Sequence, residues 1–270
     1  LLITAHPDDE SMFFAPLLAH FSKEAARLAD LSCDTPAEKT SITERFDVHI
    51  LCLSTGDADG LGQRRSLELL AAARVAGVPV AHVHTRSHPQ LRDGLCEQWP
   101  TDVVAALVEE TVAELADAYA DVALATFDAR GVSGHPNHTD THRGVMRLLR
   151  RIALAPEVNR LPLRLHCWLL PTFSLFRKYT AWLLAWPALA AHALSPARGW
   201  AWLCAPSGGA VAWEAMKAHA SQWVWYRRLF VPMAAYTYAT PLRVASADDI
   251  RRACEDDDDN NGSLFARSEK

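Results

Sequence analysis

Four ionisable side chains stand within five positions near the start of the chain, in the stretch LLITAHPDDE: His6, Asp8, Asp9 and Glu10. Neutral imidazole and carboxylate groups both ligate divalent metal ions such as zinc. A further carboxylate beside such an ion can accept a proton. The stretch therefore indicates a metal site with a neighbouring base, although these residues alone do not separate ligands from base.

A second candidate group, GHPNH, places His135 and His138 three positions apart at the start of an expected helix. Taken separately, such histidines serve as helix caps or as polar surface residues. Combined with the first stretch, they predict a three-ligand site made of His6, Asp9 and one of the two histidines. That ligand set leaves an open position for water, as catalytic zinc sites do.

The elements that must position both groups alternate along the first half of the chain. Apolar runs predict strands at residues 1–4, 46–54, 80–85 and 121–127. Helical spacing predicts helices at 11–23, 63–76, 101–119 and from about 137. This order is typical of an α/β fold: a Rossmann-like, doubly wound, mostly parallel sheet with helices on both faces. The site is expected at the C-terminal ends of the strands, where the two groups can meet.

The second half of the chain has a less regular pattern. It predicts strands at 163–170 and 200–204 and a long, aromatic-rich helix at 210–230. Residues 1–250 are expected to form one domain. Within it, residues from about 24 to 45 are expected to form a helix end and a surface loop that extend away from the core. The acidic stretch 251–270 is expected to be a disordered tail.

Composition narrows the class of protein. Of the 270 residues, 50% are apolar and 22% charged, which suits a globular domain with a sizeable core. The net charge of -5 gives no basic field, so no nucleic-acid partner is expected. The six cysteines are scattered without any CxxC pair, which is typical of reduced thiols in a cytosolic setting.

The sequence leaves open whether and how the chain is attached to a membrane. Charged residues interrupt the longest apolar run before it reaches the ~20 residues that a spanning helix needs. The chain begins with Leu1 instead of Met, so an upstream signal or anchor is a further expectation. Residues 180–194 are the candidate for a segment lying on a membrane surface, and a buried helix is the alternative.

Both motifs resemble those of the PIG-L and LmbE-like family of zinc-dependent de-N-acetylases, through AHPDDE at 5–10 and GHPNH at 134–138. Further similar stretches are MFFAP, LCLSTGDADGLG, RSLEL, TFDARGVSGHPNH, FRKY and SQWVWYRRLF. The resemblance is closest to the eukaryotic members, which deacetylate N-acetylglucosaminyl-phosphatidylinositol in glycosylphosphatidylinositol (GPI) anchor synthesis. It implies that glycolipid as substrate, a membrane surface as partner, and a location at the cytoplasmic face of the endoplasmic reticulum membrane.

The resemblance also implies roles for the motif residues. His6, Asp9 and His138 would bind zinc, Asp8 would be the general base, and His135 would stabilise an oxyanion or protonate the leaving amine. The underlying chemistry agrees, because a divalent metal lowers the pKa of water to about 7. Attack on an acetamide then creates an oxyanion that a metal and an imidazole stabilise. Iron or cobalt could occupy the same ligands.

Four residues outside this set are also candidates. Glu10 is expected to support the turn or the N-terminus of the following helix. The resemblance implies that Arg65 binds substrate phosphate or inositol, whereas an exposed ion pair with Glu68 is the alternative. By the same resemblance Asp93 contacts sugar hydroxyls, with an ordinary turn residue as the alternative. Asp128, at the end of a strand, is expected to orient a histidine ligand by contacting it without binding the metal itself.

Two other functions fit the same motifs. One is a soluble de-N-acetylase acting on another N-acetylglucosaminyl conjugate, which shares the metal chemistry. The other is a catalytically silent subunit that binds the sugar lipid, and the intact HPDDE and HPNH sets argue against it. The tryptophans crowding the last third of the chain are expected to pack in the core, with some forming an interfacial surface beside Arg227 and Arg228.

Overall fold

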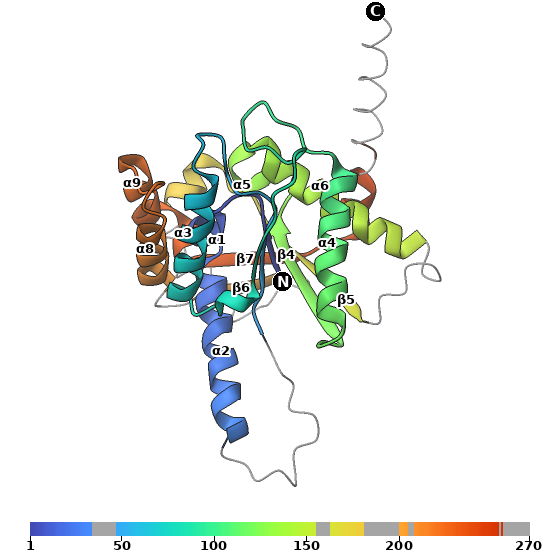
Figure 1. The fold of residues 1–270 in the computed structure, drawn as a ribbon, viewed down its shortest axis with the longest axis horizontal. Helices are drawn as coiled ribbons and strands as arrows, with labels where there is room; N and C mark the ends of the chain where they lie inside the picture. Colours follow the sequence, from blue (N-terminus) through green and yellow to red (C-terminus); the bar gives the residue numbers. More distant parts are fainter. Residues whose placement is uncertain (34–46, 155–162, 181–199, 205–207, 254, 256–270) are drawn as a thin grey trace, which may run out of the picture.

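In the computed structural model, which describes residues 1–33, 47–154, 163–180, 200–204, 208–253 and 255, a sheet lies between two layers of helices (Figure 1). The strands are β1 (Leu2–Thr4), β2 (Ile50–Cys52), β3 (Val83–Thr85), β4 (Asp121–Phe127), β5 (Arg164–Leu170), β6 (Trp200–Cys204) and β7 (Ala239–Val244). Their order across the sheet is β3-β2-β1-β4-β5-β7-β6. The first five pair in parallel, whereas β7 is antiparallel to both β5 and β6. The predicted Rossmann-like, mostly parallel α/β fold is confirmed.

The helices divide into two groups, one on each face of the sheet (Figure 1). One group has α8 (Gly208–Ala218) packed against α2 (Ala15–Cys33) and α3 (Gly62–Val75). In the other group, α4 (Thr101–Ala116) packs against α6 (Pro136–Leu154). Three shorter helices lie near the upper edge of the sheet in Figure 1: α1 (Asp9–Phe13), α5 (Gly131–Gly134) and α9 (Trp225–Met233).

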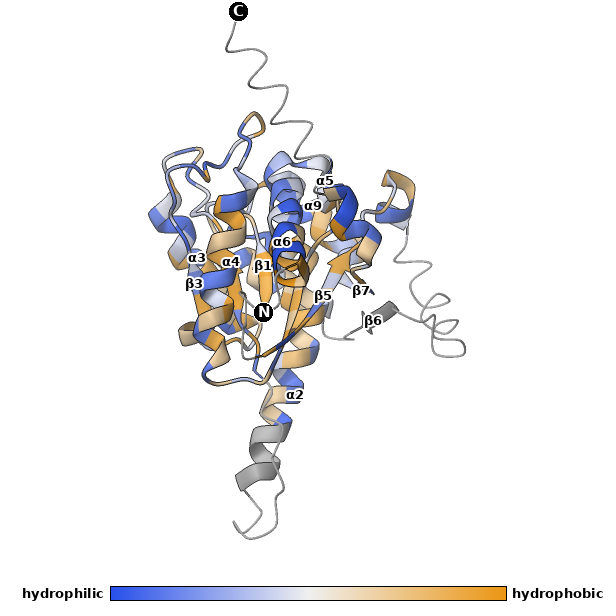
Figure 2. Cartoon of the chain, turned by 90° about the vertical axis from the view of Figure 1, so that its right-hand side faces the viewer, coloured by the Kyte–Doolittle hydropathy of each residue, from blue (hydrophilic) through white to orange (hydrophobic). Residues whose placement is uncertain are grey.

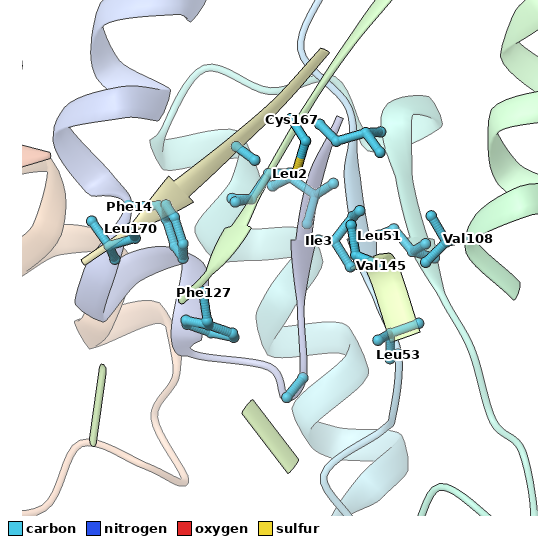
Figure 3. Packing of buried hydrophobic residues seen from close by; sticks show 14 of the residues in the cluster. Leu2, Ile3, Phe14, Leu51, Leu53, Val108, Phe127, Val145, Cys167 and Leu170 are labelled. Atoms are coloured by element: carbon cyan, nitrogen blue, oxygen red, sulfur yellow. The ribbon is translucent and has the colours of Figure 1, made fainter. Parts of the chain in front are cut away.

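The core forms where the apolar strands meet the inner faces of these helices. Leu2 and Ile3 of β1 are at most 2% exposed, and Ile3 lies beside Leu51 of β2 (Figure 3). Val108 of α4 and Val145 of α6 are fully buried in the same cluster. Figure 2 shows apolar strands inside and more polar outer helix faces. Burial on both faces explains why these strands have nearly continuous apolar sequences.

The helix expected at 11–23 has different limits. It begins at Asp9, inside the first motif, and is interrupted at Phe14, so that α1 and α2 are separate. Helix α2 then runs to Cys33, because its outer part is rich in the helix-forming residues Ala, Leu, Lys, Glu and Arg. The first part of the predicted excursion is thus helical, and residues 34–46 lie outside the described part of the chain.

The single long helix predicted at 210–230 is wrong. Helix α8 ends at Ala218, residues 219–224 turn, and α9 starts at Trp225. A residue of another helix, Glu68 of α3, stabilises this turn. Its carboxylate accepts hydrogen bonds from the backbone N–H and the hydroxyl of Ser221. Strand β7 was not predicted, since Pro241 within it weakens the strand pattern.

Smaller differences concern element ends. The strands expected at 46–54 and 80–85 shorten to three residues each, and Val80–His82 form a 3₁₀ turn. The predicted tail begins within a helix over residues 247–253, where Ala253 is buried. Residues 254 and 256–270 lie outside the described part, as do 181–194 of the proposed surface segment.

Candidate metal centre and active site

The candidate residues meet at the C-terminal edge of the sheet, as predicted. His6 to Asp9 follow β1, and His135 to His138 follow the neighbouring strand β4. From β1 the chain builds β2 and β3 on one side and then returns to build β4 and β5 on the other. In a doubly wound sheet, this switch point is where loops diverge and leave a crevice for a ligand.

Asp9 joins the two motifs. One of its carboxylate oxygens, Oδ2, accepts the backbone N–H groups of Ala5 at 3.1 Å and His6 at 2.9 Å. The other, Oδ1, lies 3.1 Å from Nε2 of His138. Burial opposes ionisation of Asp9, but the positive charge and hydrogen bond of His138, with His6, hold its pKa below the ordinary value. The side chain is therefore an anion fixed between the two histidines.

Three imidazoles surround this anion. One ring nitrogen from each of His6, His135 and His138 lies within 4.8 Å of the others. His138 directs Nε2 towards Asp9, because its Nδ1 lies 3.0 Å from the carbonyl oxygen of Gly131 and donates to it. A backbone acceptor of this kind fixes the tautomer that a metal ligand requires. His6, His135 and His138 therefore form a group that could hold a divalent metal ion, and Asp9 adjoins it through His6 and His138. Imidazole and carboxylate ligands suit zinc.

Glycine at position 131 is needed for this arrangement. Its φ of +63° lies in the left-handed region, and an added Cβ would lie 2.8 Å from Cβ of His138. Only a residue without a side chain lets the carbonyl of this loop approach the imidazole so closely. The next residue, Val132, also has a positive φ, which is unusual for a β-branched residue and marks a strained loop.

His6 is held from its other side by Asn137 at the start of α6 and by Asp93 in the loop after β3. Its Nε2 lies 3.0 Å from Oδ1 of Asn137 and 3.1 Å from Oδ1 of Asp93. Burial lowers the pKa of His6, but hydrogen bonding to Asp93 and the charges of Asp9 and Asp93 outweigh it and raise the pKa. Asn137 is fully buried and also binds the backbone of Gly94 and Glu97. The sequence reasoning missed Asn137, although it belongs to GHPNH.

His135 differs from its two neighbours. It is half-buried, and its Nδ1 accepts the backbone N–H of Asn137 at 3.2 Å. That acceptor role requires the neutral ring with its proton on Nε2, which makes Nε2 a donor. Burial, together with the positive charges of His6 and His138, lowers the pKa of His135 to about 4. The residue can therefore offer an uncharged N–H group to an oxygen in the site.

Asp8 occupies an unusual backbone conformation. Its φ is 109°, a costly value for a residue other than glycine, of the order of 1–3 kcal/mol. Glu10 supports this turn as predicted, since its Oε2 accepts the N–H of Asp8 at 3.0 Å. The carboxylate of Asp8 is buried and contacts the guanidinium groups of Arg65 and Arg227. Two guanidinium groups thus hold this carboxylate in place.

Arg65 connects loops from three strands. It donates to the carbonyl of Gly56 at 2.6 Å, to Asp93 at 3.0 Å and to the carbonyl of Pro7 at 2.9 Å. The side chain is almost fully buried, which does not agree with an exposed helix pair. Gly56 has a φ of +67°, and an added Cβ would lie 2.5 Å from Cζ of Arg65. Substrate contact by Arg65 stays a prediction, since these protein acceptors engage its guanidinium.

Asp93 lies between Arg65 and His6 and also borders a polar cavity of about 440 Å³. Burial raises the pKa of this carboxyl, but hydrogen bonds and charges from His6 and Arg65 lower it to about 2. Thr55, Asp57, His88 and Arg92 are among the other residues lining the cavity. Asp93 is therefore an ionised acceptor facing a space of suitable size for a sugar.

The prediction for Asp128 needs correction. Its carboxylate accepts hydrogen bonds from the hydroxyl of Thr172 at 2.5 Å and from the backbone of Thr172 and Arg130. It therefore fixes the loop after β5 to the loop after β4, whereas a backbone carbonyl orients His138. Every residue has a backbone carbonyl. The sequence therefore gives no sign that the carbonyl of Gly131 binds His138.

Two residues from the last quarter of the chain were also missed. Arg227 of α9 contacts Asp8, and His219 in the turn before α9 contacts Glu10. Arg227 could have been found, because it belongs to the similar stretch SQWVWYRRLF. No signal in the sequence pairs His219 with a residue so distant along the chain.

Asp57 has a structural role, and two expectations about the rest of the chain can be compared with the structure. Asp57 accepts the backbone N–H of Gly62 at 2.6 Å and so caps the start of α3. Cys52, Cys96 and Cys167 are free thiols. Among the residues described, no helix has both the length and the apolar character to cross a bilayer.

Comparison with known proteins agrees with the resemblance seen in the motifs. The PIG-L family profile, described as GlcNAc-PI de-N-acetylase, matches residues 1–149. A protein named probable N-acetylglucosaminyl-phosphatidylinositol de-N-acetylase, from Schizosaccharomyces pombe, is 35% identical over 70% of this chain and 63% of its own length. The Bos taurus N-acetylglucosaminyl-phosphatidylinositol de-N-acetylase is 31% identical over 87% of this chain and 79% of its own.

Solved structures show a similar fold. The N,N'-diacetylchitobiose deacetylase of Pyrococcus horikoshii superposes with a TM-score of 0.57 over 90% of this chain and 82% of its own, at 14% identity. The family profile covers more than half of the chain, including both motifs at the switch point. The chain therefore belongs to the PIG-L family of de-N-acetylases.

Proposed function

We propose that the chain is a zinc-dependent hydrolase that removes the acetyl group from N-acetylglucosaminyl-phosphatidylinositol, giving glucosaminyl-phosphatidylinositol and acetate. The observation that carries the proposal is the position of Asp9, fixed between His6 and His138 with Asp8 beside it. The names of the relatives supply the substrate. That substrate belongs to GPI-anchor synthesis, and we infer that the chain acts at the cytoplasmic face of the endoplasmic reticulum membrane.

His6, Asp9 and His138 would hold the metal ion. When bound, zinc acts as a Lewis acid that acidifies water and polarises the acetamide carbonyl. Asp9 contributes a fixed negative charge, and the carbonyl of Gly131 keeps His138 in the required tautomer. The loops thus preorganise the ligands before any ion arrives.

Asp8 would act as the general base. Its carboxylate takes the proton of the attacking water and then delivers it to the nitrogen that leaves as the amine. The contacts with Arg65 and Arg227 fix the position of this carboxylate before the substrate enters. The strained turn, supported by Glu10, aims this carboxylate towards the site.

His135 would stabilise the oxyanion. Its Nδ1 accepts a backbone N–H, so the neutral ring can donate through Nε2 to the oxygen on which negative charge develops. This favours oxyanion stabilisation over amine protonation, the two roles that the sequence leaves open. Asp93 would accept hydrogen bonds from sugar hydroxyls at the border of the polar cavity.

An assay on three substrates tests the proposal. Purified chain loaded with zinc should release acetate from N-acetylglucosaminyl-phosphatidylinositol and from water-soluble N-acetylglucosaminyl-inositol. Faster turnover of an unrelated soluble N-acetylglucosaminyl conjugate would reject the lipid assignment. Binding of the glycolipid without acetate release from any substrate would instead identify a silent binding subunit. Removal of metal with a chelator should abolish the activity, and zinc should restore it.

A further inference from the structure

Exposed apolar side chains gather on α9, beside the candidate site. Trp225 is 72% exposed, Tyr226 and Leu229 are each 54% exposed, and Met233 is 47% exposed. The spacing of these four residues puts them along one side of the helix. Large apolar residues rarely form such a contiguous exposed group on a soluble monomer, and a group of this kind marks an interaction site.

A second exposed group adjoins the first. Leu175 and Phe176 are each 75% exposed, within the helical residues 175–180 that follow β5. This segment packs against α9, because the ring of Tyr179 meets the ring of Phe230 at 6.3 Å in an edge-to-face contact. The two groups therefore lie on segments that pack together, and we name them jointly the α9 surface: the exposed side chains of α9 and of residues 175–180.

The two helical segments that form the α9 surface carry cations and no acidic side chain. No Asp or Glu occurs in residues 163–180 or 215–247, although the whole chain has a net charge of -5. The cations on the two helical segments are Arg177, Lys178, Arg227 and Arg228. Arg177 and Arg228 are exposed, whereas Lys178 is buried against the ring of Phe230. The surface is thus apolar and basic within an acidic protein.

Packing connects this surface directly to the metal ligands. Phe230, on the inner side of α9, meets the ring of Phe13 at 5.9 Å, and Phe13 meets the ring of His138 at 6.0 Å. Arg227 on the same helix reaches Asp8. A body that rests on the α9 surface would therefore bind the helix that contacts Asp8 and packs, through Phe13, against His138.

We propose that the α9 surface docks on a lipid bilayer that contains anionic phospholipid. Exposed Trp and Tyr with neighbouring Arg match the headgroup region of a membrane, and basic side chains favour its negative surface potential. The inference rests on the proposed function, in which the diacyl part of the substrate stays in the bilayer while its sugar enters the site. No acidic side chain on either segment opposes this approach.

Vesicle flotation tests the docking surface without catalysis. The full chain should float with vesicles of phosphatidylcholine mixed with phosphatidylserine, float less with pure phosphatidylcholine, and float less as salt is raised. The double variant Trp225→Ser/Leu229→Ser should lower the bound fraction at least about tenfold, because it removes apolar groups that would enter the interface. Its melting temperature, compared with that of the original chain, verifies that it is folded.

The matched control is Leu67→Ser, which changes a 68% exposed leucine on α3, away from the α9 surface. It should float like the original chain. The proposal is overturned if the double variant also floats like the original chain, or if none of the proteins floats. A concentration-dependent dimer that the double variant abolishes, without any flotation, would assign the surface to a second copy.

The two proposals fail in distinguishable ways. A chain that deacetylates the soluble substrate but does not float contradicts only the docking surface. A chain that floats through the α9 surface but releases no acetate from any substrate contradicts the proposed function.

Discussion

Nε2 of His219 lies 2.7 Å from Oε1 of Glu10, although 209 positions separate them in the sequence. His219 is fully buried and Glu10 is 1% exposed. Burial lowers the pKa of His219, but the charge and hydrogen bond of Glu10 outweigh it and raise the pKa. Because Glu10 also supports the N–H of Asp8, the turn before α9 helps to hold the candidate catalytic turn.

Replacing His219 should therefore destabilise the fold. His219→Ala leaves the Glu10 carboxylate buried without its partner, which costs about 3–5 kcal/mol in such pairs. Unfolding in urea measures the loss of free energy. The control is His20→Ala, which changes an exposed histidine on α2 and should stay within about 0.5 kcal/mol. Equal losses for the two variants would refute a supporting role for the pair.

Asp8→Asn should separate catalysis from metal binding. If Asp8 is the general base, deacetylation should fall by about 10²- to 10⁴-fold, while zinc content stays at the original level. Metal analysis and acetate release from one preparation check both expectations. Asp59→Asn, at an exposed position in the loop after β2, should leave both unchanged. Full activity in Asp8→Asn would remove this residue from the mechanism.

The metal content of alanine variants should distinguish the roles of the three histidines. His6→Ala and His138→Ala should each lose bound zinc along with activity, because they remove proposed ligands. His135→Ala should retain zinc while its maximal rate falls, since the proposed role is donation to the oxyanion. Loss of zinc in His135→Ala would make it a ligand, an outcome that its proximity to the other two rings allows.

Two glycines of one loop provide a matched test for Arg65. Gly56 and Gly60 both have positive φ values, 67° and 71°, but an added Cβ meets Arg65 only at Gly56. Gly60→Ala should cost about 1 kcal/mol of stability through backbone strain alone, with activity retained. Gly56→Ala should cost more and also lower activity, because the guanidinium that holds Asp8 and Asp93 must move. Identical behaviour of the two variants would contradict this role.

The stability of the fold should depend on pH through His49, the residue directly before β2. Its ring stacks on the ring of His82, with centroids 4.0 Å apart. Burial, together with the positive charge of His82, lowers the pKa of His49 to about 4. The unfolded chain, with an ordinary histidine pKa of about 6.5, then binds more protons between pH 4 and 6.5. The free energy of unfolding should therefore fall as the pH drops through that window.

The variant His49→Gln isolates this contribution, because other groups of the protein also titrate below pH 6.5. Urea unfolding at several pH values should give a shallower dependence for the variant than for the original chain. Parallel curves would show that His49 is not responsible. Above pH 6.5 both proteins should show no dependence arising from this position.

Local patterns predicted the elements that carry most of the site. Four of these elements are apolar or amphipathic over their own lengths: the strands β1 and β4 and the helices α3 and α4. Their own sequences are therefore sufficient to predict them. The proposed ligands follow β1 and β4, and adjacent parallel strands bring such loops together whatever the loops contain. The meeting of His6 and Asp9 with the two histidines of GHPNH was therefore within reach of the sequence, whereas the choice of His138 as ligand rests on the resemblance to the family.

Contacts made by single side chains over long separations could not be predicted in the same way. The break between α8 and α9 depends on Glu68 binding Ser221, and helix-forming residues on both sides conceal it. The interruption at Phe14 is marked only by Pro16, which favours the first turn of a new helix, while the apolar residues keep their helical spacing across it. The role of Asp128 was misjudged because the actual partner of His138 is a backbone carbonyl, which every residue possesses.

The separation between Glu10 and His219 also has a consequence during synthesis. At about 5–20 residues per second, the ribosome needs roughly 10–40 s to make the residues that separate this pair. For that time the nascent chain carries its complete HPDDE motif while the Glu10 carboxylate has no histidine partner. The buried pair can therefore close only after residue 219 has been made, so this turn is completed later than the turns formed within the first half of the sequence.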